Sequence, residues 1–181
     1  MRFQKTPLKD AYLVTLEPWR DKRGFFERVF CQKTFRQIGL KKPIVQVNYS
    51  LTKKAGIIRG LHYQLSPYTE AKLVTCLSGK IFDCIVDLRR GSPTFLKWYG
   101  VILSEENQKM LYAPEGFAHG LQTMSKSCGT LYLNTNFFHE SHERGLRYND
   151  PLVGIKWKQK PIEISEKDSQ RPLLKPNFEG I

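Results

Sequence analysis

The sequence of 181 residues lacks the features that would place it in a membrane or outside the cell. No apolar run reaches the roughly 18 residues of a membrane span, and the start, MRFQKTPLKD, has no hydrophobic signal segment. The four cysteines, Cys31, Cys76, Cys84 and Cys128, form no Cys-x-x-Cys pair, so we expect reduced and mostly buried thiols rather than disulfides. These absences predict a cytoplasmic protein with no membrane partner.

Acidic residues are also few, since 17 Asp and Glu stand against 29 Lys and Arg, giving a formal net charge of +12. Such a surplus attracts anions, including nucleic acid and small phosphate-bearing molecules. The basic residues are scattered, however, and the one dense stretch, Lys156–Lys160, lacks the pattern of RNA-binding segments. We therefore expect no nucleic-acid partner, and interpret the charge as a solvated surface or as attraction for a small polyanionic substrate.

Short β-type runs are what the sequence has in quantity. They recur about every 8 to 15 residues, which predicts an all-β sandwich or barrel. Gly79 predicts a tight turn joining two strands of an antiparallel hairpin. Helical patterns occur only at Cys31–Ile38 and Ser104–Lys109. We expect a single domain over residues 1–181, with the barrel core at about 44–157 and a proline-containing tail at 158–181 that docks on the barrel.

Alternation along the strands predicts which side chains share a face. Gln46, Asn48 and Ser50 form one polar face of the run that begins at residue 44. Lys72 and Asp83 fall on the apolar faces of two later strands. An ionised side chain in such a place is costly unless it is paired or functional, so both residues are candidates for a site.

The segment RGLHYQ combines cations with a histidine. Arg59 precedes His62 by three residues, and Lys72 follows ten positions later. Alternation puts His62 on the face opposite to Arg59, unless Gly60 introduces a bulge that turns the strand. A single histidine on a strand is usually structural, but cations around a histidine suit an anionic or enolate-forming substrate.

Three other residues are ambiguous from their surroundings alone. His119 follows a Pro-Glu-Gly turn and is either a ligand-binding residue or a core histidine bonded to a carboxylate such as Asp83. Tyr132 lies in the strand-like segment TLYLNT, where an ordinary barrel tyrosine is also expected. Asp168 lies in the tail, and no sequence rule selects it.

Metal binding has a specific signature in barrels of this size, namely two histidines one residue apart followed by a glutamate and another histidine. The corresponding stretch here reads His62-Tyr63-Gln64, and His139 and His142 fall in a polar turn. We therefore expect no metal site.

The order of the motifs carries more information than any one of them. DKRGFFERVF, VQVNYS, IIRGLHYQ, AKLVTCLSGKIFDCIVDLRRGSPTF, APEGFAHG, TLYLNTNFF and ISEKD follow one another in a way that strongly resembles the dTDP-4-dehydrorhamnose 3,5-epimerase family. The resemblance extends from about Asp21 to Asp168. It implies a cupin-type jelly-roll barrel that acts as a homodimer on a nucleotide sugar, with no metal and no organic cofactor.

The resemblance also implies roles by position. His62 would be the general base, Asp168 would orient its imidazole, Lys72 would lie beside the substrate ketone, and Tyr132 would donate a proton from the opposite face. The positions that would bind the nucleotide sugar are Arg23, Gln46, Asn48, Arg59, His119, Glu143 and Lys167, with Phe138 stacked on the base.

The implied reaction inverts C3 and C5 of dTDP-4-keto-6-deoxy-D-glucose to give dTDP-4-keto-L-rhamnose. A C4 ketone acidifies the hydrogens on both carbons, and an imidazole with an ordinary pKa of about 6.5 can remove them near neutral pH. Other readings stay open: a related epimerase that acts on one carbon or on another nucleotide sugar, a sugar-nucleotide ketoisomerase, and a non-enzymatic sugar-binding cupin.

Two departures from the family pattern bear on specificity. Arg28 stands where a substrate-contacting glutamate is expected, and the neighbouring Glu27 would point to the other face of a strand unless a bulge returns it. Phe137 and Phe138 replace a Tyr-Tyr pair, which keeps the rings but removes the hydroxyls. The nucleotide base and the exact sugar therefore stay open.

Overall fold

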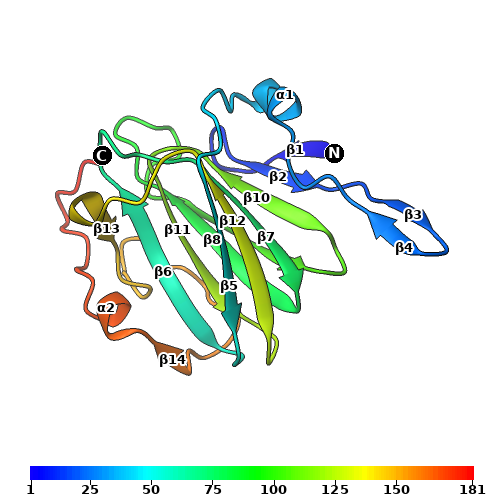
Figure 1. Ribbon diagram of the computed structural model, residues 1–181. Helices are drawn as coiled ribbons and strands as arrows, with labels where there is room; N and C mark the ends of the chain where they lie inside the picture. The colour runs from blue at the N-terminus through cyan, green and yellow to red at the C-terminus, as the bar shows by residue number, and fades with distance from the viewer.

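The computed structural model describes all residues from 1 to 181 and consists mainly of two facing β-sheets (Figure 1). One sheet has the strand order β1 (Arg2–Lys5), β2 (Tyr12–Thr15), β10 (Lys109–Ala113), β7 (Lys72–Ser78), β12 (Cys128–Asn134) and β5 (Gln46–Thr52). The second has the order β13 (Glu143–Gly145), β6 (Ile57–Gln64), β11 (Phe117–Thr123), β8 (Lys80–Asp87) and β9 (Trp98–Ser104), with β14 (Glu163–Ile164) parallel to β6. The helical segments are α1 (Gln32–Phe35), η1 (Arg36–Ile38), η2 (Glu140–His142) and α2 (Glu166–Ser169).

This architecture confirms the predicted all-β fold with a few short helices. The predicted helical pattern near Cys31–Ile38 corresponds to α1 and η1. Strands β1 and β2 precede residue 44 and belong to the first sheet, so the barrel also uses the start of the chain. No helix of the structure is both long enough and apolar enough to cross a membrane.

The two sheets are held together by an apolar core between them. Val74 and Leu111 from the first sheet pack in one cluster with Ile85 and Leu121 from the second, and each is at most 1% exposed. Full burial of such a side chain contributes about 1.5–3 kcal/mol before the entropy of ordering is subtracted. The cysteines are unpaired, and all except Cys31 are buried.

The inner face of the first sheet changes from apolar to polar across its width. Residues directly opposite one another on adjacent strands run Leu13, Leu111, Val74, Tyr132 and Asn48 from β2 to β5. The apolar half closes the barrel on the core. The polar half, which includes the predicted polar face of β5, is left to line a cavity.

The turn at Gly79 corrects one prediction. Gly79 has a positive φ of 73° and joins β7 to β8, as expected for a tight turn. The two strands do not form a hairpin, however, because β7 is already paired with β10 and β12, while β8 is paired with β11 and β9. The turn therefore carries the chain from one sheet to the other.

The predicted helical turn at Ser104–Lys109 is also wrong. The side chain of Ser104 accepts a hydrogen bond from Asn107 N at 3.2 Å, and Asn107 Oδ1 accepts one from Ser104 N at 3.1 Å. These are the bonds of a helix cap, but here they close a short turn between β9 and β10. Side-chain capping alone does not extend a helix when the next residues pair in a sheet.

The tail beyond residue 158 runs along the second sheet and packs on it, as predicted (Figure 1). Leu174, Phe178 and Ile181 pack against buried residues on the outer side of that sheet, and Ile181 N donates to Leu88 O at 2.8 Å. Docking of the tail brings α2 next to β6.

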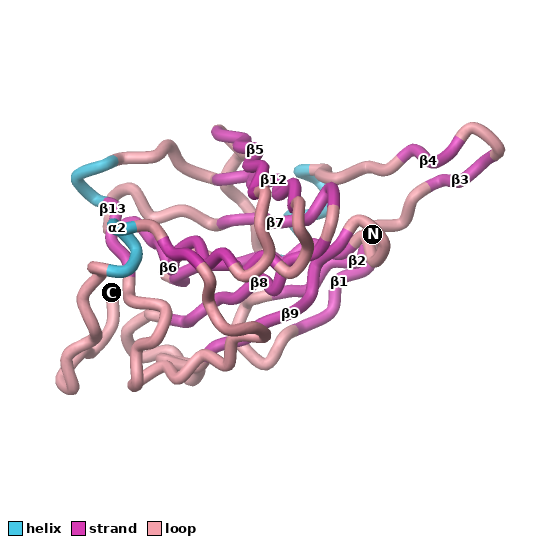
Figure 2. The backbone as a smooth tube through the Cα atoms, turned by 90° about the horizontal axis from the view of Figure 1, so that it is seen from below, coloured by secondary structure: helices cyan, strands magenta, loops and turns pink.

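A hairpin formed by β3 (Trp19–Asp21) and β4 (Gly24–Phe26) projects away from the barrel in both backbone views (Figures 1 and 2). Its aromatic side chains are exposed, at 59% for Trp19, 56% for Phe25 and 69% for Phe26. Such surface is unusual for a segment with no partner.

Candidate active site

A cavity of about 500 Å³ lies between the sheets, on the side where the first sheet is polar. Its walls come from strands β5, β6, β7, β11 and β12 and from the tail around α2. Of the residues predicted for the site, the following line it: Gln46, Asn48, Arg59, His62, Lys72, His119, Tyr132, Phe138, Glu143, Lys167 and Asp168. Among the predicted site residues, Arg23 alone lies elsewhere.

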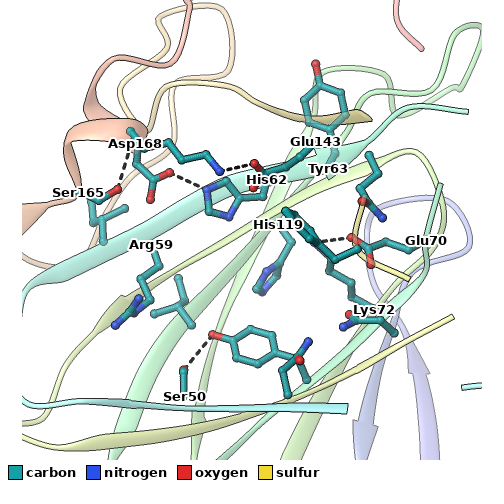
Figure 3. A pocket seen from close by; sticks show the side chains of 18 of the residues that line it. Ser50, Arg59, His62, Tyr63, Glu70, Lys72, His119, Glu143, Ser165 and Asp168 are labelled. Atoms are coloured by element: carbon teal, nitrogen blue, oxygen red, sulfur yellow. Dashed lines mark hydrogen bonds and ion pairs between the residues drawn. The ribbon is translucent and has the colours of Figure 1, made fainter. Parts of the chain in front are cut away.

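His62 and Asp168 form a close pair, seen in Figure 3. His62 Nε2 lies 2.6 Å from Asp168 Oδ1, and the other carboxylate oxygen accepts a hydrogen bond from Gly60 N at 3.0 Å. Ser165 caps α2 by accepting from Asp168 N at 3.1 Å. With Nε2–H donating to the carboxylate, the second ring nitrogen of His62, which has no protein partner, is the basic one.

The charge on Asp168 is maintained by its surroundings. Burial opposes ionisation, but hydrogen bonds from His62, Gly60 and Ser165 outweigh it, so the pKa of Asp168 is held below its usual value. The His62 side chain is 32% exposed, against 6% for Asp168. The imidazole of His62 is thus accessible from the cavity, while the carboxylate of Asp168 that orients it is buried.

Gly60 explains why Arg59 and His62 both reach the cavity. Simple alternation predicts opposite faces, but the register between β6 and β11 shifts between the pairs His119–His62 and Leu121–Arg59. Gly60 has a φ of +102°, and a Cβ there would lie 2.6 Å from His119 O. The bulge considered for this position is therefore present, and only glycine fits it without strain.

Tyr132 lies on the wall opposite His62, because β12 belongs to the first sheet and β6 to the second. Its hydroxyl is 3.5 Å from Ser50 Oγ, and Figure 3 shows Ser50 across the cavity from His62. Burial raises the pKa of Tyr132, and the charge of Asp83 adds to that effect. The phenol therefore stays protonated well above neutral pH.

His119 makes a second histidine–aspartate pair, with Nε2 2.7 Å from Asp83 Oδ1. The side chains are 7% and 0% exposed, and Asp83 Oδ2 has no hydrogen-bond partner. The His119 ring also lies edge-on to Tyr132, with ring centres 6.0 Å apart, and forms part of the cavity wall. The sequence left open whether His119 pairs with a carboxylate such as Asp83 or binds a ligand. The structure shows the pairing and also places His119 in the cavity wall.

Lys72 is paired as a buried lysine requires. Its Nζ lies 3.0 Å from Glu70 Oε1, with side-chain exposures of 15% and 10%. Glu70 also lines the cavity, and sequence reasoning missed it because it lies in the loop between β6 and β7, where no periodicity applies. Asn134 faces Lys72 in register, is 5% exposed, and has an Oδ1 without a partner.

Glu143 anchors basic side chains of the tail. It forms ion pairs with Lys167 and, at 3.1 Å, with Arg171. Burial opposes its ionisation, but these cations together with His62 hold the pKa of Glu143 below its usual value. Sequence reasoning missed Ser165 and Glu163, which line the cavity, and Arg171, which holds Glu143 from outside it, since their place depends on how the tail docks.

The rim of the cavity carries an exposed aromatic ring. Phe138 is 54% exposed, and its backbone N–H donates to Gln46 Oε1 at 3.0 Å. Gln46 Nε2 in turn donates to Asn48 Oδ1 at 3.3 Å. A flat apolar face beside polar amides is a suitable surface for a nucleobase.

Two arginines in and just after the projecting hairpin, Arg23 and Arg28, lie outside this cavity. Arg23 is in the turn of the hairpin and pairs with Asp21. Arg28 is exposed, with its guanidinium 5.9 Å from the centre of the Trp19 ring. Glu27 is partly buried with one unpartnered oxygen, and burial raises its pKa, but it does not line the cavity either.

A metal site would require at least three His, Cys, Asp or Glu side chains close together, and the structure has no such group.

Comparison with known proteins decides the family. The model of the dTDP-4-dehydrorhamnose 3,5-epimerase family matches residues 5–176. The chain belongs to this family. A dTDP-4-dehydrorhamnose 3,5-epimerase from Shigella flexneri is 43% identical over 169 residues, which cover 93% of each chain.

Solved structures agree with this assignment. The dTDP-4-dehydrorhamnose 3,5-epimerase from Elizabethkingia anophelis superposes with a TM-score of 0.92 at 39% identity, covering 98% of both chains. The dTDP-6-deoxy-D-glucose-3,5-epimerase from Legionella pneumophila, solved with dTDP-4-keto-L-rhamnose, gives 0.91 at 38% identity, covering 95% of this chain and 92% of that one. The present member of the dTDP-4-dehydrorhamnose 3,5-epimerase family is thus an isomerase with a cupin jelly-roll fold.

Proposed function

We propose that the chain converts dTDP-4-keto-6-deoxy-D-glucose to dTDP-4-keto-L-rhamnose, with His62 as general base and Tyr132 as general acid. The observation that carries this proposal is their placement on opposite walls of one cavity, the first oriented by Asp168 and the second buried and protonated. Inversion of a carbon requires removal of a proton from one face and return of a proton to the other.

In the first step the unpartnered nitrogen of His62 takes the proton from C3 or C5. The electron pair of the C–H bond moves into the carbonyl, giving an enolate with its charge on the C4 oxygen. Lys72 on the neighbouring wall supplies a cation for that oxygen, in a site where electrostatic interactions are stronger than in water. Asp168 meanwhile stabilises the imidazolium that forms.

In the second step Tyr132 donates its hydroxyl proton to the same carbon from the opposite face. A phenol with a raised pKa is a weak acid, so it responds only to a basic acceptor such as the enolate carbon. The tyrosinate then regains a proton from water, and the imidazolium releases one. Repetition at the other carbon completes the double inversion.

The nucleotide is held by the outer part of the cavity. Arg59 and Lys167 supply positive charge for the pyrophosphate, and an arginine can bind a phosphate with two parallel hydrogen bonds. Phe138 offers its exposed face to the base, while Gln46 and Asn48 offer polar groups beside it. His119 and Glu143 complete the proposed contacts to the sugar nucleotide.

We also propose that the single epimerase domain, residues 1–181, forms a homodimer. Edge strand β5 exposes Val47 at 59%, Tyr49 at 58% and Leu51 at 47%, and an apolar edge strand is a natural pairing surface. A second copy would cover this surface and the projecting hairpin, and would allow Arg23 to reach a cavity other than its own. Light scattering should give the mass of two chains, and Tyr49→Lys should shift it toward one.

The reaction is tested by proton NMR of dTDP-4-keto-6-deoxy-D-glucose with the protein in deuterated water. We expect the C3 and C5 proton signals to disappear as the inverted product forms. Exchange at one carbon would instead identify a single-site epimerase, and a ketone appearing at C3 a ketoisomerase. Binding without any exchange would identify a sugar-binding cupin.

A further inference from the structure

Glu70 is an unexplained charge in the cavity. Its side chain is 10% exposed, and apart from the 3.0 Å ion pair with Lys72 the carboxylate has no polar partner in the protein. An ionised carboxylate accepts hydrogen bonds through two oxygens, so the ion pair leaves acceptor capacity free for a ligand in the cavity. Figure 3 shows Glu70 and Lys72 at the same end of the cavity.

The backbone that carries Glu70 is tied down on both sides. In the loop between β6 and β7, Ala71 N donates to Thr135 Oγ1 at 2.8 Å, and Asn136 Nδ2 donates to Thr69 O at 3.3 Å. These bonds fix the backbone on both sides of Glu70 to the end of β12. Groups fixed before a ligand arrives bind it without a further cost of ordering.

A negative charge here works against the proposed chemistry unless it has a second role. Lys72 is placed to stabilise an enolate, yet Glu70 beside it repels that same enolate. A hydrogen-bond donor from the substrate would satisfy the carboxylate and reduce this repulsion. The donor must lie next to the oxygen that Lys72 contacts.

An α-hydroxyketone has this arrangement. Its ketone oxygen accepts a hydrogen bond, and the hydroxyl on the neighbouring carbon donates one. Lys72 and Glu70 present the complementary donor and acceptor 3.0 Å apart. In a 4-keto sugar the hydroxyl beside the ketone is that of C3, and in the planar enolate between C3 and C4 both oxygens lie in one plane.

We propose that Glu70 is a specificity residue that accepts a hydrogen bond from the C3 hydroxyl, so that the Lys72–Glu70 pair selects nucleotide-linked α-hydroxyketones. This inference rests on the proposed function, because it takes the C4 ketone to lie at Lys72. Under this proposal, the end of the cavity that holds Glu70 and Lys72 recognises the C4 ketone and the C3 hydroxyl of the sugar.

The test compares the 4-keto-6-deoxy sugar nucleotide with analogues that lack the C3 or the C2 hydroxyl. The rate of deuterium exchange at C5, a carbon present in all three, gives kcat/KM. Wild type should lose about 10- to 100-fold when the C3 hydroxyl is absent, as for a hydrogen bond to a charged group. In Glu70→Ala the two substrates should agree within about threefold, and Glu70→Gln, which still accepts, should be intermediate.

Glu163→Ala is the matched control, because Glu163 also lines the cavity and pairs with a lysine, Lys54 at 2.8 Å. Glu163→Ala should leave the ratio between the rates with the full substrate and with the C3-deoxy analogue as in wild type. Loss of the C2 hydroxyl should have the same effect in wild type and in Glu70→Ala. Undiminished discrimination in Glu70→Ala, or an effect confined to the C2-deoxy analogue, would overturn the proposal. If wild type exchanges none of the substrates, the proposed function fails and this inference fails with it. The isosteric Glu70→Gln variant answers the question if Glu70→Ala does not fold.

Discussion

Two histidine–aspartate pairs stand side by side in this molecule and differ in what surrounds them. His62 and His119 are opposite each other on β6 and β11, and each places Nε2 within 2.7 Å of a carboxylate oxygen. The Asp168 carboxylate is hydrogen-bonded at both oxygens, whereas Asp83 keeps one buried oxygen without a partner. His62 is 32% exposed, against 7% for His119.

The difference favours a separate task for each pair, with His62 as the proposed general base and His119 as part of the cavity wall. A general base must reach the substrate and keep one nitrogen free, and its carboxylate must stay fixed while charge develops. The His62 pair meets these conditions. The His119 pair is enclosed and packs against Tyr132, so it is suited to shaping the cavity rather than to exchanging protons with solvent.

Replacing the proposed base should produce the largest effect. In His62→Ala, exchange at C3 and C5 should fall by about 10³-fold or more, because no other group takes the proton. Nucleotide-sugar affinity, measured by calorimetry, should change little. His119→Ala is the comparison: it should raise KM and lower kcat by less than about tenfold. Similar losses of kcat in both variants would abolish the distinction between the pairs.

Tyr132→Phe should separate the two halves of the reaction. The ring remains but the proton donor is lost, so we expect epimer formation to fall by about 10²–10³-fold while deuterium exchange on the original face continues within about tenfold of wild type. Both quantities come from one NMR time course. Epimer formation at the wild-type rate would remove Tyr132 from the mechanism.

Changing the carboxylates tests how each pair depends on its aspartate. Asp168→Asn should lower kcat by about 10²-fold, because an amide does not stabilise the imidazolium and favours the wrong tautomer. Asp83→Asn should alter KM more than kcat, since its histidine does not exchange the substrate proton. Steady-state kinetics on both variants, with unfolding midpoints to verify the fold, would show a reversed order if the roles were exchanged.

The smallest expected effect is on stability in acid. Because the pKa of Asp168 is lower in the folded protein, its contribution is present above the unfolded pKa of about 3.9 and is lost as the pH falls through the lower folded value. The advantage of wild type over Asp168→Asn in urea unfolding should therefore shrink between pH 6 and about pH 2. A constant difference across this range would show that folding does not shift the pKa of Asp168.

The sequence predicted what depends on local patterns. Alternation identified the polar face of β5 and the unusual positions of Lys72 and Asp83, both of which proved to be paired. The turn signal at Gly79 identified a tight turn but not that it crosses between sheets, because the partners of the two strands decide this. Strict alternation does not hold at Gly60, where the bulge that the sequence allowed for adds one residue to the strand and reverses the face.

Other parts of the site were beyond local reasoning. Asp168 was indicated by family resemblance alone, because its contact with His62 spans 106 residues of sequence. Glu70 lies in a loop and Ser165 in the tail, where neither alternation nor helical periodicity operates. For Arg23 the structure shows a place outside the cavity of the same chain, so its contact with substrate stays a prediction that involves a second copy.

The origin of Asp168 in the docked tail has a consequence for the time at which the protein becomes competent during synthesis. Ribosomes add roughly 5–20 residues per second, so the chain grows for about 5 to 20 s between the appearance of His62 and that of its partner. Through that interval the imidazole of His62 has no carboxylate partner from the tail. We therefore expect proton abstraction to begin only after α2 has emerged and docked, because a chain cut short before residue 166 lacks both the carboxylate that orients His62 and the Lys167 cation proposed for the pyrophosphate.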